Sequence, residues 1–150
     1  PPTLPTGASI QPLKVRSLEG QEQVISFAES KTPVVIYVFT PECVWCSRNL
    51  ENIRTLLTQK QGAYRFVGLS LSKKNDVKDY VAQTKLDFPV FEGLSDEAMQ
   101  EYKLGITPQT IVVSPEGKVV QNWVGAYVGS NQTEIEKFFG IQLPGVTNAK

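Results

Sequence analysis

The sequence contains no histidine and only two cysteines among its 150 residues. A structural zinc site needs four soft ligands, so two thiolates without an imidazole predict no metal site. Basic and acidic residues are equal in number, at 15 each, and neither sign forms a long block. This balance argues against a nucleic-acid surface, so the expected partner is a protein or a small thiol.

Long apolar runs are also absent. The longest, residues 34–39, is far shorter than the roughly 20 residues needed to cross a bilayer, and no charged-then-apolar leader precedes it. The length suits one domain with its own core. We expect a flexible Pro-rich linker over residues 1–12, the domain over 13–142 and a flexible tail over 143–150. Such a linker is compatible with a leader or a membrane anchor outside the given sequence.

What the chain does have is Cys43-Val44-Trp45-Cys46, where a β-branched and aromatic run gives way to a helical pattern. Two cysteines at this spacing can close a disulfide, and a helix N-terminus stabilises the thiolate of the first. A purely structural disulfide across two residues would constrain little of the unfolded chain. The pattern therefore predicts a thiol–disulfide exchange centre whose disulfide is its only cofactor.

Apolar periodicity predicts the order of the secondary-structure elements. Residues 34–39 are apolar at nearly every position, which is typical of a central strand covered on both faces. We expect a hairpin around residues 13–27, strands over 65–71, 110–114 and 118–124, and helices over 43–59, 75–84, 95–105 and 130–140. Strands that alternate with helices before a final hairpin and helix indicate an α/β sandwich with a mixed central sheet.

This order, with Cys-x-x-Cys after the first long strand, resembles the thioredoxin fold. Gly105-Ile106-Thr107-Pro108 stands just before a predicted strand, where thioredoxin-like proteins carry a cis-proline facing the active-site sulfurs. The initial hairpin, the strand and helix over 65–84, the step Phe88-Pro89-Val90 and the turn over 114–119 are similar to the TlpA/ResA-like extracytoplasmic thioredoxins. The resemblance covers roughly residues 13–140.

The resemblance implies that Cys43 is the nucleophile and that Cys46 is the resolving thiol. It also implies that Thr107 and Pro108 shape the substrate groove, and Trp45 is expected to contact substrate beside the cysteines. Further implications are protein thiols or disulfides as substrates, an upstream redox donor, and a monomer that acts outside the cytoplasm, in the periplasm or tethered to a membrane that faces it.

Three positions near the cysteines depart from the family. Glu42 follows Thr40-Pro41, where a tryptophan and a small residue are usual, and Tyr37 replaces the buried aspartate of thioredoxins. Asn49 replaces the glutamate that the TlpA/ResA group often carries three residues after the second cysteine. Asn49 is expected near the sulfurs, where it would hydrogen-bond a thiolate or water; the alternative is that it satisfies a backbone carbonyl. We interpret Glu42, Asn49 and Tyr37 as modulators of the site.

Other functions compete with disulfide exchange. Thr40-Pro41-Glu42-Cys43 fits the Thr-x-x-Cys part of a peroxiredoxin site, but Ile36 and Tyr37 stand where its proline would fall, and the last arginine is Arg65. A non-catalytic copper(I)-binding module is a second alternative, because two thiolates suit a soft ion, and an interaction domain without turnover is a third. No histidine stands between the cysteines to stabilise a thiolate strongly, which favours a reductant over a powerful oxidant.

Overall fold

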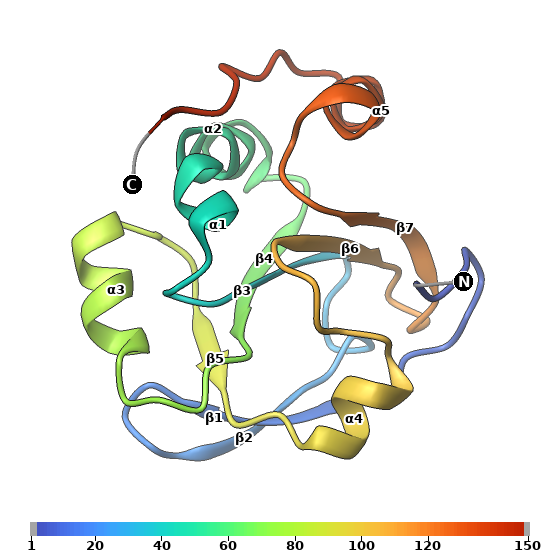
Figure 1. Cartoon of the computed structure of the whole chain (residues 1–150). Coiled ribbons are helices and arrows are strands. Elements are labelled where there is room, and N and C mark those ends of the chain that lie inside the picture. Colours follow the sequence, from blue (N-terminus) through green and yellow to red (C-terminus); the bar gives the residue numbers. More distant parts are fainter. Residues whose placement is uncertain (1–2, 149–150) are drawn as a thin grey trace.

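The computed structural model describes residues 3–148. Within this range the elements are β1 (Leu13–Ser17), β2 (Glu22–Ile25), β3 (Val34–Phe39), α1 (Val44–Arg48), α2 (Leu50–Lys60), β4 (Arg65–Ser70), α3 (Val77–Thr84), β5 (Val90–Glu92), α4 (Asp96–Glu101), β6 (Gln109–Val113), β7 (Val119–Val124) and α5 (Gly129–Phe139). They form one mixed sheet in the order β2-β1-β5-β4-β3-β6-β7 (Figure 1). Among these described helices, none is long and apolar enough to cross a membrane.

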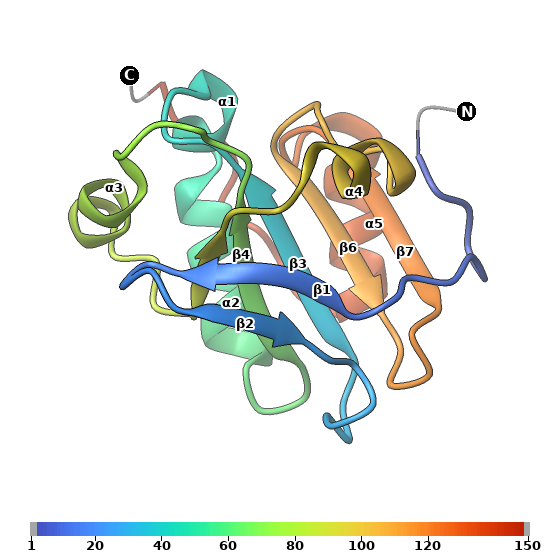
Figure 2. The ribbon, with the colours of Figure 1, turned by 90° about the horizontal axis from the view of Figure 1, so that it is seen from below.

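Strand β3 lies inside the sheet between β4 and β6, both of its faces are covered, and all six of its residues are buried. Successive side chains on a strand point to opposite faces. Those at 35, 37 and 39 join an apolar cluster with α2 and α5, whereas those at 34, 36 and 38 join a second cluster with the β1–β2 hairpin and α4. Figure 1 shows α2 and α5 on one side of the sheet and α4 on the other, and Figure 2 shows β1 and β2 on the near side of β3 and β4.

The predicted mixed sheet with an N-terminal hairpin is confirmed, and β1 pairs antiparallel with β2. Two details differ from the sequence-based expectation. Strand β5 has only three residues, too few to reveal a period of two, and it pairs parallel with β4 and antiparallel with β1. The single helix expected over residues 43–59 is two helices, because Asn49 has φ −92° and ψ 0° and separates α1 from α2.

The expected linker over residues 1–12 is a packed edge of the sheet where the structure describes it. Backbone N–H groups of Gly7 and Ile10 donate to the carbonyls of Val119 and Gly117, each at 2.8 Å, and the N–H of Val119 donates to Ala8 at 2.8 Å. Ile10 is buried in the second apolar cluster. Prolines exclude a helix here but permit an extended segment that pairs beside β7. Residues 1–2 lie outside the described range.

The expected tail over residues 143–150 is also held to the domain as far as residue 147. Leu143 is buried, and its N–H donates to the Glu136 carboxylate at 2.8 Å. The N–H of Gly145 donates to Asn52 Oδ1 at 2.8 Å, and that of Thr147 donates to the Arg48 carbonyl at 3.0 Å. Figure 1 shows this C-terminal segment passing alongside α2 and α1. Residues 149–150 lie outside the described range.

Gly68 on β4, the strand that pairs parallel with β3, gives a prediction about core packing. A Cβ atom at this position would lie 2.7 Å from Phe88 Cε1 and 3.0 Å from Val90 Cγ2. Both neighbours are buried, so the Gly68→Ala substitution overpacks the core, and we expect it to lower the free energy of unfolding by about 1–3 kcal/mol. Urea unfolding measures this loss.

Gly62→Ala is the matched control, because nothing lies within 4 Å of the Cβ position there. We expect it to change the stability by no more than about 0.5 kcal/mol. Equal stabilities of the two variants would contradict the close packing of Phe88 on Gly68.

Candidate active site

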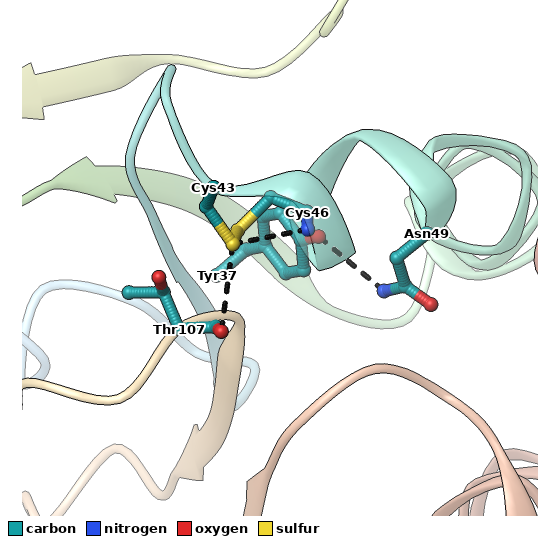
Figure 3. The surroundings of a disulfide bond; sticks show 5 residues. All are labelled: Tyr37, Cys43, Cys46, Asn49 and Thr107. Carbon is teal, nitrogen blue, oxygen red and sulfur yellow. Dashed lines mark hydrogen bonds between the residues drawn. A yellow bond between two sulfur atoms is a disulfide. The ribbon is translucent and has the colours of Figure 1, made fainter. Parts of the chain in front are cut away.

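Cys43 and Cys46 are joined by a disulfide at the start of α1, with their Cα atoms 5.2 Å apart (Figure 3). Cys43 is the N-cap residue of α1, and the N–H of Cys46 donates to Cys43 Sγ at 3.0 Å. In the reduced protein the same N–H group is placed to stabilise a negative charge on the Cys43 sulfur.

The two cysteines differ in exposure. Cys43 is half-buried, whereas only 1% of Cys46 is exposed and it belongs to the core cluster with Tyr37 and Ile53. An incoming thiolate or disulfide therefore reaches Cys43 and not Cys46. This difference agrees with the roles of nucleophile and resolving thiol that the sequence predicts for them.

The loop before β6 lies directly against the disulfide. The Thr107–Pro108 peptide bond is cis, the isomer expected from the sequence, and the Thr107 carbonyl oxygen lies 3.5 Å from Cys43 Sγ (Figure 3). Pro108 is buried and Thr107 is half-buried. The loop and the half-buried Cys43 thus lie together, at the place expected for a substrate groove.

The side chain of Asn49 makes no hydrogen bond to either sulfur in the described structure, and this corrects the expectation that it would hydrogen-bond a thiolate. It is fully buried, and its Nδ2 atom donates to the Tyr37 hydroxyl at 3.3 Å (Figure 3). Its Oδ1 atom accepts from the backbone N–H of Tyr127 at 2.9 Å and from Asn52 Nδ2 at 3.0 Å. The alternative expectation, that Asn49 hydrogen-bonds a backbone group, is closer to the structure, although its partner is the N–H of Tyr127 and not a carbonyl.

These bonds belong to a buried polar network behind the disulfide. Asn52 continues it to the C-terminal segment at Gly145, and the Tyr127 hydroxyl hydrogen-bonds Thr110 at 2.6 Å. Burial raises the pKa of Tyr37 well above its usual value of 10.0, and burial also raises the pKa of Tyr127. Both phenols therefore stay protonated near neutral pH, and Tyr37 cannot take a proton from a thiol as an aspartate could.

Glu42, the residue before the nucleophile, faces solvent. Its carboxylate pairs with Lys74 Nζ at 2.9 Å, and both side chains are largely exposed. The contact raises the pKa of Lys74, first through the hydrogen bond with Glu42. Salt screens such exposed pairs, so Glu42 contributes little to stability.

Three exposed apolar side chains, Val44, Trp45 and Ile106, stand next to site residues in the sequence. Val44 is 53% exposed, Trp45 46% and Ile106 64%, and Val128 near the start of α5 is also exposed. Sequence reasoning selected Trp45 but missed Ile106, and it missed Arg48, whose Cζ atom lies 4.8 Å from the centroid of the Trp45 ring. The i, i+3 spacing of Trp45 and Arg48 was the available signal for that contact.

The chain combines a Cys-x-x-Cys disulfide at the start of a helix, a cis-proline loop against it and a mixed sheet. These features define a thioredoxin-like protein with a site for disulfide exchange. The chain belongs to the AhpC/TSA family, whose sequence model matches residues 6–122. No curated protein sequence matches it.

Solved structures share this fold at low sequence identity. A putative thiol:disulfide interchange protein DsbE from Chlorobium tepidum has a TM-score of 0.77 at 16% identity, covering 91% of this chain and 97% of its own. The thioredoxin domain of a thiol-disulfide oxidoreductase from Bacteroides vulgatus has a TM-score of 0.71 at 21% identity, covering 91% and 99%. StoA from Bacillus subtilis has a TM-score of 0.66 at 17% identity, covering 87% and 99%.

Proposed function

We propose that this protein is a thiol–disulfide oxidoreductase that reduces disulfides in other proteins. The observation that carries this proposal is the disulfide itself, with a half-exposed Cys43 sulfur 3.5 Å from the Thr107 carbonyl and a buried Cys46 behind it. The family match and the names of structural neighbours, which include a thiol-disulfide oxidoreductase, support it.

Exchange proceeds in two balanced steps. In the first, the Cys43 thiolate attacks one sulfur of the substrate disulfide, which forms a mixed disulfide and releases one substrate thiolate. In the second, the Cys46 thiolate attacks Cys43 Sγ, which closes the Cys43–Cys46 disulfide and releases the second substrate thiolate. The substrate gains two electrons and the protein loses two, and the two protons of the cysteine thiols end on the released thiols.

The second step needs a group that accepts the proton of the Cys46 thiol. The two positions at which related proteins carry a carboxylate hold Tyr37 and Asn49 in this chain. Tyr37 stays protonated because burial raises its pKa, and Asn49 has no proton-accepting group. A buried thiol without a base gives up its proton slowly near neutral pH. We propose that water or hydroxide entering beside Cys43 takes this proton.

The surface around Cys43 suits an extended segment of a protein substrate. The cis-Pro108 loop presents the Thr107 backbone beside the sulfur, and the exposed side chains of Val44, Trp45 and Ile106 offer apolar contact. An extended peptide can pair with a backbone edge and place alternate side chains against such a surface. The disulfide needs no further cofactor, and a separate thiol donor must reduce it after each turnover.

We propose that the protein acts outside the cytoplasm, in the periplasm or at a membrane that faces it, and the TlpA/ResA-like resemblance supports this proposal. A single copy of the chain contributes the whole site, so we propose that it acts as a monomer.

Equilibration against glutathione buffers tests the proposal. We expect one two-electron transition of the Cys43–Cys46 pair, nearer the thioredoxin value of about −270 mV than the DsbA value of about −120 mV. The reduced protein should also speed the reduction of insulin by dithiothreitol, and Cys43→Ser should remove this acceleration.

Turnover of hydrogen peroxide tests the competing peroxidase function. Arginines stand only at positions 16, 48, 54 and 65, and none donates a hydrogen bond to Cys43 in the described structure. Peroxide should therefore be consumed no faster with the reduced protein than with dithiothreitol alone. Rapid peroxide turnover that Cys43→Ser abolishes, without insulin reduction, would favour a peroxidase.

A further inference from the structure

Arg48 contacts Trp45, which stands between the two cysteines of the disulfide, and its guanidinium forms no ion pair among the described residues. Its guanidinium lies over the ring of Trp45, the residue that immediately precedes Cys46, and that ring is 46% exposed. The Nε atom is shielded from solvent and has no hydrogen-bond partner among the described residues. The contact with the Trp45 ring restrains the guanidinium, so less freedom is lost when it binds a ligand.

The two acidic residues closest to Arg48 in the sequence, Glu42 and Glu51, pair with other cations. Glu51 follows Arg48 by three residues, in α2, but its carboxylate pairs with Arg54. Glu42, next to Cys43, pairs with Lys74 at 2.9 Å. No ion pair of the described chain includes Arg48. Among the described residues the guanidinium therefore has no carboxylate partner.

We propose that Arg48 selects substrates that carry a carboxylate close to the reacting sulfur. This inference rests on the proposed function, because it concerns the substrate of the same disulfide. The carboxylate would accept hydrogen bonds from the guanidinium while the substrate sulfur meets Cys43 and its flanking residues lie on Trp45. Small thiols such as glutathione and cysteine peptides with acidic neighbours share this chemistry.

Reduction of the oxidised protein by thiols that differ only in charge tests the proposal. The first arm compares glutathione with its diethyl ester, and the second compares cysteine peptides whose neighbouring residue is Glu, Gln or Lys. Each rate constant is corrected for the pKa of the attacking thiol. In the wild type we expect the acidic member of each set to react about two- to fivefold faster than its neutral partner, the range typical of an exposed ion pair.

Arg48→Gln should bring the acidic and neutral rates together, and Arg48→Lys should keep only part of the preference because a lysine lacks the planar fork. Lys31→Gln is the matched control: it removes one positive charge from an exposed position near the opposite end of β3, with no ion pair in the described chain. It should leave the preference unchanged.

The ratio of the acidic to the neutral rate constant distinguishes recognition of a carboxylate by Arg48 from a structural effect of the substitution. Loss of packing on Trp45, or loss of a cation in the last turn of α1, would slow acidic and neutral thiols equally. If only glutathione reacts faster than its ester, the carboxylate that Arg48 recognises belongs to a small thiol. If only the acidic peptide reacts faster than its neutral partner, that carboxylate belongs to a protein substrate. If the wild type shows no preference in either arm, or if Arg48→Gln retains it, the inference is wrong, although exchange through Cys43 would still stand.

Discussion

A Cys46→Ala variant is expected to accumulate mixed disulfides through Cys43, whereas Cys43→Ala should form almost none. The half-exposed Cys43 sulfur lies on the surface shared with Thr107, so substrate can reach it, and without Cys46 no internal thiol resolves the product. Cys46 is 1% exposed and has no such access in the folded protein. Non-reducing electrophoresis and mass spectrometry after incubation with an oxidised protein measure the adducts.

Alkylation provides the control for this result. In the reduced wild type, a limiting amount of iodoacetamide should modify Cys43 first, and Cys43→Ala should react slowly until urea unfolds it. The rate of insulin reduction should fall to the uncatalysed rate in both variants, because turnover needs both thiols. Equal trapping through Cys46 in the folded Cys43→Ala variant would reverse the assigned roles.

The elements that sequence predicts best are those with a strong local signal. The uninterrupted apolar run of β3 requires cover on both faces, and the structure supplies it from both sides of the sheet. The Cys-x-x-Cys pair and Pro108 likewise carry their own chemistry. The sequence could therefore place Cys43, Cys46 and the cis-proline loop in one site without knowledge of side-chain packing.

The features that sequence could not predict depend on contacts between distant segments. The N-terminal residues look unstructured by composition, yet Gly7 pairs with Val119, more than a hundred positions away. The break at Asn49 is equally non-local, because its side chain serves Tyr37 on β3 and the backbone of Tyr127. A helical pattern without Pro or Gly gives no sign of such a break.

Asn49→Leu is expected to lower the free energy of unfolding by about 2–6 kcal/mol. Leucine has a similar size but accepts no hydrogen bond, so the Tyr127 N–H and the Asn52 amide would lose their acceptor in a fully buried place. Each buried donor left without a partner costs about 1–3 kcal/mol. A domain of this kind has only about 5–15 kcal/mol of stability in total, so the loss is large.

Urea unfolding of the oxidised protein measures this loss, with Asn75→Leu as the control at an exposed asparagine outside the network. The control should change stability by no more than about 0.5 kcal/mol. Because the Asn49 side chain makes no hydrogen bond to the sulfurs, the pH dependence of exchange by folded Asn49→Leu should match that of the wild type. A stability change as small as the control's would contradict the network, and a shifted pH profile would show that Asn49 acts on the thiols, as the family's glutamate position suggests.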